Sequence, residues 1–250
     1  MGKLDNRTAL ITGAASGIGK AIAKKFAMEG ANIAVVDIAK QPAEELVQEI
    51  KKSGKRAISI ICDVTDERQV EQAVEEAVKE FGALHILVNN AGVSPLKPFE
   101  EITLEDWNKV LGINLTGPFL FTKAAFPYIK VAGPKGRIIN MGSLAGQIGG
   151  IAVGLHYTAT KGGIMAMTKQ LAKLLAPYKA TANSIAPGTT DTPLIQGWSK
   201  ETKEALIKQI PLGRLGLPED VANVALFIAS DESQFITGAT FNVNGGMFTC

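Results

Sequence analysis

The chain has 250 residues, of which 46% are hydrophobic and 20% are charged. This length and composition suffice for one large core, and they exclude wholesale disorder and a division into two full-sized domains. The 26 Lys and Arg residues nearly balance the 24 Asp and Glu residues without any basic block. The charge therefore gives no reason to expect a nucleic acid or an anionic membrane as a partner.

The apolar segments of the chain are short. The longest, 32–36 and 57–62, have the length of a strand and fall far short of the ~20 residues that a membrane-spanning helix needs. The first residues carry charge where a signal peptide would have its apolar segment. Two cysteines, Cys62 in an apolar run and Cys250, provide no disulfide framework. We therefore expect a soluble cytoplasmic protein.

Short apolar runs rich in β-branched residues alternate with longer amphipathic stretches. In chain order, strands are predicted at 7–12, 32–37, 57–62, 84–89, 136–141, 181–185 and 239–243. Helices are predicted at 17–29, 41–53, 67–81, 104–116, 118–131, 156–176 and 219–229. The strand runs are almost continuously apolar, as in a parallel sheet that is covered on both faces. The alternation predicts an α/β fold, with a doubly wound Rossmann-type sheet of about seven strands in a single domain spanning 1–250.

The segment 189–215 interrupts this rhythm. It follows the predicted sixth strand, has turn residues at both ends and contains a short amphipathic stretch. Long excursions after the carboxyl end of a strand often carry function in this architecture. We expect the segment to form a lid over a substrate.

Glycines gather where the first predicted strand passes into the first predicted helix. The sequence from residue 12 to residue 19 is TGAASGIG. Glycines permit a tight turn and a close approach to a diphosphate, whose charge the helix N-terminus favours. Asp37 ends the second predicted strand, close to the spacing of about 20 residues at which a carboxylate holds an adenosine ribose. The sequence therefore predicts a dinucleotide site, the alternative being an ordinary glycine-rich turn.

The glycine spacing TGxxxGxG resembles that of the short-chain dehydrogenase/reductase family, and the resemblance continues over nearly the whole chain. The other matching positions are Asn89-Asn90-Ala91-Gly92, Asn114, Ser143, Tyr157, Lys161, Pro187-Gly188 and Asn244-Gly245-Gly246. Each string is a weak signal alone, but together they occur in order after successive predicted strands. The resemblance implies a nicotinamide-dependent oxidoreductase that is a homotetramer, as its relatives commonly are.

Tyr157 and Lys161 lie one turn apart on the same face of a predicted helix. A phenol with a pKa of ~10 accepts protons poorly near neutral pH, but a nearby ammonium group favours its ionised form. Tyr157 is therefore the expected general acid or base for the substrate oxygen. By the resemblance, Ser143 would hydrogen-bond that oxygen, Lys161 would also hold the nicotinamide ribose, and Asn114 would position a water.

The resemblance also assigns contacts with the cofactor. Asp63 and Val64 would form the adenine pocket, and Thr192 would meet the nicotinamide amide. The full expected set is Gly13, Ser16, Gly17, Ile18, Gly19, Asp37, Ile38, Asp63, Val64, Asn90, Ala91, Gly92, Tyr157, Lys161, Pro187, Gly188, Thr190 and Thr192.

Asp37 favours NAD over NADP as the cofactor. A carboxylate accepts a hydrogen bond from the ribose 2′-hydroxyl and repels a 2′-phosphate. Relatives that prefer the phosphorylated cofactor often carry a basic residue where this chain has Ser16 or Ile38. No cluster of His, Cys, Asp and Glu has the spacing of metal ligands, so no metal is expected.

Three functions fit these motifs. The first is interconversion of a secondary alcohol and a ketone by hydride transfer with NAD(H). The second, suggested by the chain length and the VNGGM ending, is reduction of a 3-oxoacyl-[acyl-carrier-protein] with NADPH, for which Lys123, Lys130 and Lys135 would face the acidic carrier. The third is a nucleotide-binding scaffold without catalysis, which would not need the Asn, Ser, Tyr and Lys set.

The substrate pocket is expected to involve residues 94–96, 144–156 and the lid. Four apolar side chains are expected in this pocket, namely Leu96, Ile148, Ile195 and Trp198. They predict an uncharged alcohol or ketone as the substrate. His156 adjoins Tyr157 but should face a different direction on the helix, and His85 is expected at a strand edge.

Overall fold

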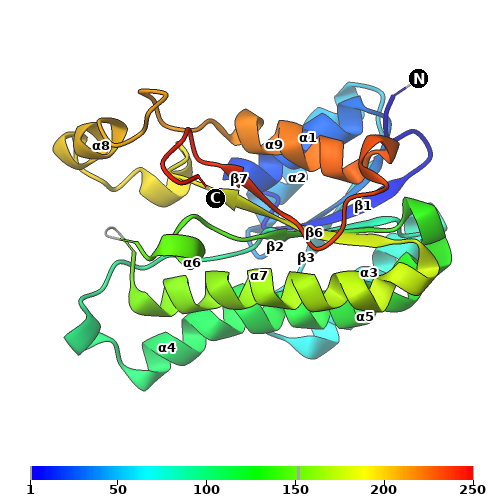
Figure 1. Ribbon diagram of the computed structural model, residues 1–250. Coiled ribbons are helices and arrows are strands. Elements are labelled where there is room, and N and C mark those ends of the chain that lie inside the picture. The colour runs from blue at the N-terminus through cyan, green and yellow to red at the C-terminus, as the bar shows by residue number, and fades with distance from the viewer. Residues whose placement is uncertain (1, 151–152, 250) are drawn as a thin grey trace.

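The computed structural model describes residues 2–150 and 153–249 of the chain. At its centre is a sheet of seven parallel strands in the order β3-β2-β1-β4-β5-β6-β7 (Figure 1). The strands are β1 (Thr8–Thr12), β2 (Asn32–Asp37), β3 (Ala57–Ile61), β4 (Ile86–Asn89), β5 (Arg137–Met141), β6 (Thr181–Pro187) and β7 (Thr240–Val243). The predicted α/β doubly wound sheet is confirmed, and each strand falls where the sequence indicates it.

Helices cover both faces of this sheet. They are α1 (Gly17–Met28), α2 (Lys40–Lys52), α3 (Glu67–Phe81), α4 (Leu104–Leu111), α5 (Gly117–Ala132), α6 (Ala145–Ile148), α7 (Leu155–Leu175), α8 (Lys200–Ile207) and α9 (Pro218–Ala229). Short 3-10 turns lie at Phe99–Glu101, Gly133–Lys135, Ala176–Tyr178, Pro193–Ile195 and Asp231–Ser233. Helices α1, α2 and α9 pack on one face, and α3, α5 and α7 pack on the other (Figure 1).

Each interior strand supplies side chains to two cores. In β1, Ala9 and Ile11 pack beneath α1, α2 and α9, whereas Leu10 between them packs against α3, α5 and α7. In β2, the side chain of Val35 packs on the first of these faces and that of Val36 on the second. Successive side chains of a strand point to opposite faces, and both faces are buried. This arrangement explains why the strands read as continuous apolar runs.

The helices expected at 104–116 and 118–131 form one continuous helical segment. The π-helical turn Gly112–Thr116 joins α4 to α5, so the predicted break near residue 117 is wrong. The turn buries Asn114 in its middle. Single π-helical turns inside longer helices are frequent at functional sites.

Two short helices lie outside the predicted set. Helix α6 follows β5, and α8 lies within the segment expected to be a lid. The Ser199 hydroxyl starts α8 by accepting a hydrogen bond from the backbone of Thr202 at 3.1 Å, as an N-cap residue does. Within the described residues, no helix combines the length and hydropathy needed to cross a lipid bilayer.

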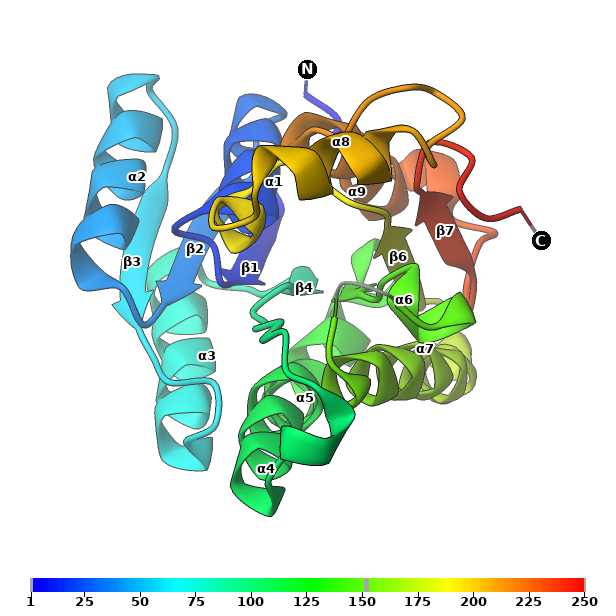
Figure 2. The same cartoon turned by 90° about the vertical axis from the view of Figure 1, so that its left-hand side faces the viewer.

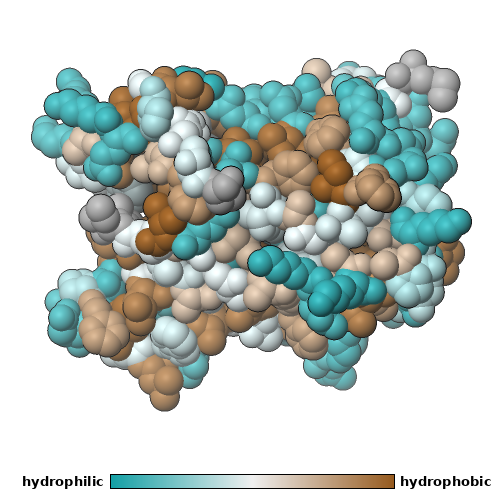
Figure 3. Space-filling model, in the orientation of Figure 1, coloured by the Kyte–Doolittle hydropathy of each residue, from teal (hydrophilic) through white to brown (hydrophobic). Residues whose placement is uncertain are grey.

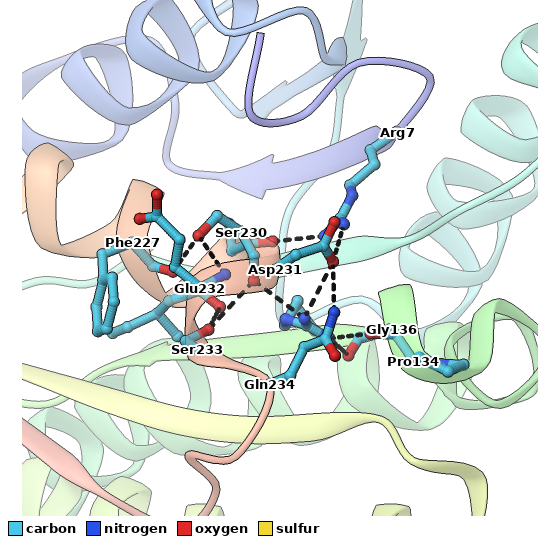
Figure 4. Close-up of polar contacts among 12 residues, drawn as sticks. Arg7, Pro134, Gly136, Phe227, Ser230, Asp231, Glu232, Ser233 and Gln234 are labelled. Carbon is cyan, nitrogen blue, oxygen red and sulfur yellow. Dashed lines mark hydrogen bonds and ion pairs between the residues drawn. The ribbon is translucent and has the colours of Figure 1, made fainter. Parts of the chain in front are cut away.

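Two buried arginines hold α9 at the amino ends of the strands (Figure 4). Arg7 donates to the carbonyl of Ala229 at 2.7 Å, and Arg137 donates to the carbonyl of Ser230 at 3.0 Å. The carboxylate of Asp231 pairs with the Arg7 guanidinium. Burial, together with the neighbouring charge of Arg7, lowers the pKa of Arg137 to about 10. The cations thus meet the carbonyl end of the helix, where positive charge is favoured.

Candidate active site

A cavity of about 720 Å³ opens at the carboxyl ends of the strands. Figure 2 looks onto this end of the sheet, with α6 and α8 beside it. Segments that follow each of the seven strands line the cavity, with Met247 as the contribution after β7, together with α7 and α8. Parallel strands bring these segments to one edge, which is where ligands bind in open α/β sheets.

The loop between β1 and α1 forms one wall. Gly13 and Gly17 have φ angles of +60° and +52°, which favour glycine. A Cβ at Gly13 would lie 2.8 Å from the Cα of Ala91, so this position also needs a residue without a side chain. The side chain of Asn90 donates to the carbonyls of Thr12 and Gly13, each at 3.0 Å, and fixes the loop from the β4 side.

Gly19 is the one expected member of the glycine loop that does not line the cavity. A Cβ at this position would lie 2.2 Å from the carbonyl oxygen of Gly13, so Gly19 lets α1 begin directly under the loop. The loop and the N-terminus of α1 thus form a cradle with the shape and polarity that a diphosphate needs.

Asp37 lies at the cavity wall with both carboxylate oxygens engaged. One oxygen accepts from the backbone of Ala15 and the other from the backbone of Ala39, each at 2.9 Å. An ionised carboxylate oxygen still has a free lone pair after one such bond, so the fixed group can accept from a ribose hydroxyl. Ile38 beside it is 69% exposed and brings no positive charge.

Cys62, Asp63 and Val64 line the cavity beyond Asp37. Asp63 holds this turn, because its carboxylate accepts from both the backbone and the hydroxyl of Thr65. Burial raises the pKa of the Cys62 thiol to about 12, so the group behaves as an apolar wall. From the sequence, Cys62 was expected only in the core. Its position next to Asp63, an expected cofactor contact, could have indicated that it lines the cavity.

Ser143, Tyr157 and Lys161 converge on the same cavity. Ser143 follows β5, and the other two residues lie on one face of α7. The Tyr157 and Ser143 side chains share a hydrogen bond. The ammonium nitrogen of Lys161 lies 5.6 Å from the centre of the Tyr157 ring and donates to the carbonyl of Met141 at 2.7 Å.

The pKa of Tyr157 is not lowered below its ordinary value, contrary to what the sequence led us to expect. Burial of the phenol raises its pKa, and the hydrogen bond with Ser143 offsets only part of that rise. Burial also lowers the pKa of Lys161 to about 8. The ammonium group bonds to a carbonyl beside the ring and not to the hydroxyl, so desolvation outweighs charge attraction at both groups.

Asn114 lies behind the cavity wall rather than in it. Its side-chain oxygen accepts from the backbone of Val93 at 2.9 Å, and its nitrogen donates to the Val93 carbonyl at 2.9 Å and to the Thr160 hydroxyl at 3.3 Å. The amide therefore fastens the loop after β4. A Cβ at Gly92 would lie 3.3 Å from the Asn114 oxygen and 3.7 Å from the Lys161 nitrogen, so Gly92 keeps open the space between them.

The rest of the cavity is largely apolar. The charged side chains in the described part of its wall are Asp37, Asp63 and Lys161. The apolar end is lined by Val93, Leu144, Ile148, Val153, Leu194, Ile195, Trp198, Leu206 and Met247, with Ser94 and Gln209 as polar neighbours.

Some expected pocket residues lie elsewhere. Leu96 is 64% exposed and outside the cavity wall. His156 is buried against its own helix, where it accepts from the backbone of Tyr157 at 3.0 Å, and it does not line the cavity. Residues 151 and 152 of the expected segment 144–156, and Cys250, lie outside the described residues. Leu206 and Gln209 belong to the segment 189–215 that was expected to border the substrate, whereas Met247 was not expected in the pocket.

All the other residues expected to touch the cofactor line the cavity, including Thr190, Thr192, Pro187 and Gly188. Thr192 faces the glycine loop, since a Cβ at Gly17 would lie 3.4 Å from the Thr192 Cβ. Among the described residues, no group of three or more His, Cys, Asp or Glu side chains is arranged as a metal site.

Residues 13–248 match the family model described as Enoyl-(Acyl carrier protein) reductase. A 3-oxoacyl-[acyl-carrier-protein] reductase of Thermotoga maritima is 39% identical over 98% of this chain and 99% of its own length. A 2,5-dichloro-2,5-cyclohexadiene-1,4-diol dehydrogenase of Sphingobium indicum is 41% identical over 98% of this chain and 97% of its own length. The crystal structure of a dehydrogenase/reductase from Sinorhizobium meliloti 1021 superposes with a TM-score of 0.94 at 36% identity, covering 98% of this chain and 96% of that one.

Proposed function

The chain belongs to the short-chain dehydrogenase/reductase family of oxidoreductases, and on that premise we propose that it interconverts a secondary alcohol and a ketone with NAD(H). One observation carries the proposal. A hydroxyl, a phenol and an ammonium group from Ser143, Tyr157 and Lys161 meet in a cavity that is also lined by a glycine loop at a helix N-terminus.

The residues of the cavity fit a dinucleotide. The glycine loop would hold the diphosphate, Asp37 the adenosine ribose, and Asp63 with Val64 the adenine. Thr192, close to the loop, would meet the nicotinamide amide. When bound there, a nicotinamide cofactor supplies the hydride chemistry.

Tyr157 would move the proton. Its raised pKa keeps the phenol protonated at neutral pH, so it is ready to donate to a ketone oxygen. Ser143 would hydrogen-bond the same oxygen and stabilise the negative charge that develops there. Lys161, with a pKa of about 8, is mostly an ammonium ion at neutral pH and stabilises negative charge beside the ring. Asn114 would act by holding the loop that carries Val93.

The proposal of NAD as the preferred cofactor rests on Asp37. Its carboxylate is fixed by two backbone N–H groups and so cannot easily turn away from a 2′-phosphate. The neighbouring wall residues Ser16 and Ile38 offer no compensating cation. Like charges at close range are costly, which favours the cofactor without the 2′-phosphate.

The second candidate is reduction of a 3-oxoacyl-[acyl-carrier-protein] with NADPH, and the relative from Thermotoga maritima favours it. The lysines expected to face the carrier are partly engaged. Lys123 pairs with Glu67 at 2.9 Å, and Lys130 lies 5.4 Å and 5.2 Å from the ring centres of Phe126 and Tyr178. The ion pair of Lys123 reduces the positive charge that an acidic carrier would meet, whereas Lys130 keeps its charge.

The test is a spectrophotometric screen of the purified protein. NAD⁺ reduction is followed with secondary alcohols, polyols, hydroxysteroids and 3-hydroxyacyl thioesters, and NADPH oxidation with acetoacetyl thioesters. Turnover of an uncharged alcohol with NAD⁺ is the expected result, and Tyr157→Phe should abolish it while dinucleotide binding persists. Faster turnover of acetoacetyl thioesters with NADPH would establish the second candidate, and dinucleotide binding without any turnover would indicate a scaffold.

The segment 189–215 is proposed to cover the substrate. Leu194, Trp198 and Leu206 of this segment line the apolar end of the cavity. Its two ends are joined, because the backbone of Asp191 donates to the Gly216 carbonyl at 2.8 Å and Gly216 donates to the Thr189 carbonyl at 2.9 Å. The segment between them therefore projects from a closed base.

We also propose a cytoplasmic homotetramer. Phe119 on α5, Leu155 and Leu174 on α7, and Phe235 after α9 are large apolar side chains that are about half exposed or more. In Figure 3, hydrophobic side chains also gather over α9 and β7. Exposed apolar surface of this kind marks association sites. Size-exclusion chromatography with light scattering tests the assembly, and a monomeric mass would reject it.

A further inference from the structure

The chain makes a closed turn directly after β7, at residues 244–248. The side-chain oxygen of Asn244 accepts from the backbone of Gly246 at 3.0 Å, and its nitrogen donates to the Phe248 carbonyl at 3.1 Å. Gly245 and Gly246 have φ angles of +63° and +90°. These angles suit glycine, so the two glycines and the buried amide together fix the shape of the turn.

This turn lies between the sheet and the end of the segment 189–215. On one side, the backbone of Gly188 donates to the Val243 carbonyl at 2.9 Å, and a Cβ at Gly188 would lie 2.9 Å from the Cα of Asn244. On the other side, the backbone of Leu212 donates to the Gly245 carbonyl at 3.1 Å. The turn therefore anchors the last part of the covering segment to the strand end beside the cofactor cradle.

Close packing reinforces this anchor. A Cβ at Gly245 would lie 2.5 Å from a methyl carbon of Ile210, and one at Gly246 would lie 3.1 Å from the ring of Pro211. The backbone of the turn thus rests directly on these two side chains. The covering segment is held at this end by contacts that leave no room for a larger residue.

Met247 is the residue of the turn that reaches the cavity. Its half-buried side chain lines the cavity, whose wall also includes Leu206, Gln209 and Trp198. This group lies apart from the cofactor cradle in the sequence and contains no charged side chain. A thioether side chain in such a wall limits the space for an apolar substituent while tolerating different shapes.

We infer that Met247 is a specificity-determining residue, which limits the length of the apolar chain that a ketone substrate can carry. The contacts of Gly245 and Gly246 with residues 210–212 fix the backbone that carries Met247, so the limit is set by a fixed wall. That the substrate is a ketone rests on the proposed function, whereas the position of Met247 in the cavity wall does not.

The experiment measures binding as well as turnover. In a Trp107→Phe background, quenching of Trp198 fluorescence reports the dissociation constants of a series of straight-chain methyl ketones of increasing length, with NAD⁺ present because it cannot reduce them. Met247→Ala should move the best-bound ketone to a longer chain and tighten binding of the longest ketones by about tenfold, the effect of burying about two further methylenes. Met28→Ala is the matched control, because Met28 is 69% exposed and does not line the cavity.

A second variant tests the turn itself. Asn244→Asp keeps an oxygen for the backbone of Gly246 but loses the donor to the Phe248 carbonyl. We expect faster proteolytic cleavage within residues 198–212 in this variant, and a weaker dependence of ketone affinity on chain length. Cleavage and length dependence identical to those of the natural sequence would reject the anchoring role.

The outcomes separate this inference from the proposed function. Ketones that bind with the expected length dependence but are not reduced would reject the proposed function and support the role of Met247. Ketones that are reduced with the same length dependence in Met247→Ala as in the natural sequence would reject the role of Met247. If no ketone of the series binds, the role of Met247 is rejected, while the proposed function is decided by the screen of alcohols described above.

Discussion

Lys161 lies beside the ring of Tyr157 and not at its hydroxyl group. The ammonium nitrogen is 5.6 Å from the ring centre, and its hydrogen bond goes to the carbonyl of Met141. The ammonium group of Lys161 therefore does not form an ion pair with the oxygen of Tyr157. Its two members are tuned by burial, which favours the neutral form of each.

This arrangement predicts different pH dependences for the two directions of the proposed reaction. Ketone reduction needs the protonated phenol, so kcat/KM for reduction should stay level from about pH 6 to about pH 7 and fall at higher pH, as Lys161 loses its charge near its pKa of about 8. Alcohol oxidation needs the deprotonated phenol, and its kcat/KM should rise about tenfold per pH unit over the level range. Steady-state kinetics in both directions check this. An oxidation rate that does not change with pH would contradict it.

The choice of dinucleotide should depend on Asp37. Replacing Asp37 by Ala together with Ile38→Arg removes a fixed negative charge and adds a cation that can pair with a 2′-phosphate. We expect the ratio of kcat/KM for NADP over NAD to rise by about 10- to 100-fold, the range of one or two charged hydrogen bonds. Ile38→Arg alone, which retains the carboxylate, should shift the ratio less. A natural sequence that already uses NADPH tenfold better would show that Asp37 does not control the choice.

Gly92→Ala should impair turnover without unfolding the protein. The added methyl group would lie 3.3 Å from the Asn114 oxygen and 3.7 Å from the Lys161 nitrogen, so it must displace the amide that holds Val93. We expect kcat to fall about tenfold, as for small misplacements of a reacting group. Gly162→Ala is the control, because its methyl group meets only the Gly146 carbonyl at an ordinary 3.5 Å. Equal kcat values for the two variants would show that the space beside Gly92, between Asn114 and Lys161, is not needed for turnover.

Asp231→Asn should lower stability in a pH-dependent way. The hydrogen bond with Arg7 lowers the pKa of Asp231 below its ordinary value of 3.8. The ionised carboxylate therefore stabilises the fold above about pH 4, and this contribution is lost as the pH falls through the lowered pKa. The Asp231 side chain is 58% exposed, so we expect a difference in the free energy of unfolding below ~1 kcal/mol at pH 7. Denaturation at pH 7, 5 and 3 tests whether the difference in the free energy of unfolding disappears at pH 3. Glu100→Gln is the control, at an exposed carboxylate.

The sequence predicts the fold well because the parallel strands are buried on both faces. Continuous apolar runs such as 32–37 can then be separated from the amphipathic helices between them. The prediction of the elements is wrong where the local sequence has only a weak preference for a helix or for a turn. The segment around Gly117 looks like a break, but a Cβ there would lie 3.0 Å from a Val64 methyl carbon, so the glycine serves close packing inside a continuous helix.

The site is less predictable at its apolar end. Motif glycines and the Ser, Tyr and Lys set have positions fixed by the strand ends, and the structure brings them together. The part played by Met247 depends on a turn whose shape comes from Asn244 and on contacts with Pro211, all of them tertiary. Leu96, by contrast, looks like a pocket residue in the sequence and faces away, because the loop that bears it is tied to α4 by the Lys97–Asp106 ion pair at 2.5 Å.

The clamp that Asn90 places on the glycine loop has a consequence for synthesis. Thr12 and Gly13 leave the ribosome long before Asn90, yet their carbonyls need the Asn90 amide to hold them in the conformation described. We expect a nascent chain that ends before β4 to lack this clamp and to hold the glycine loop only through its contacts with β2, such as that of Ala15 with Asp37. On this expectation, the glycine loop is complete only after translation has passed the middle strand.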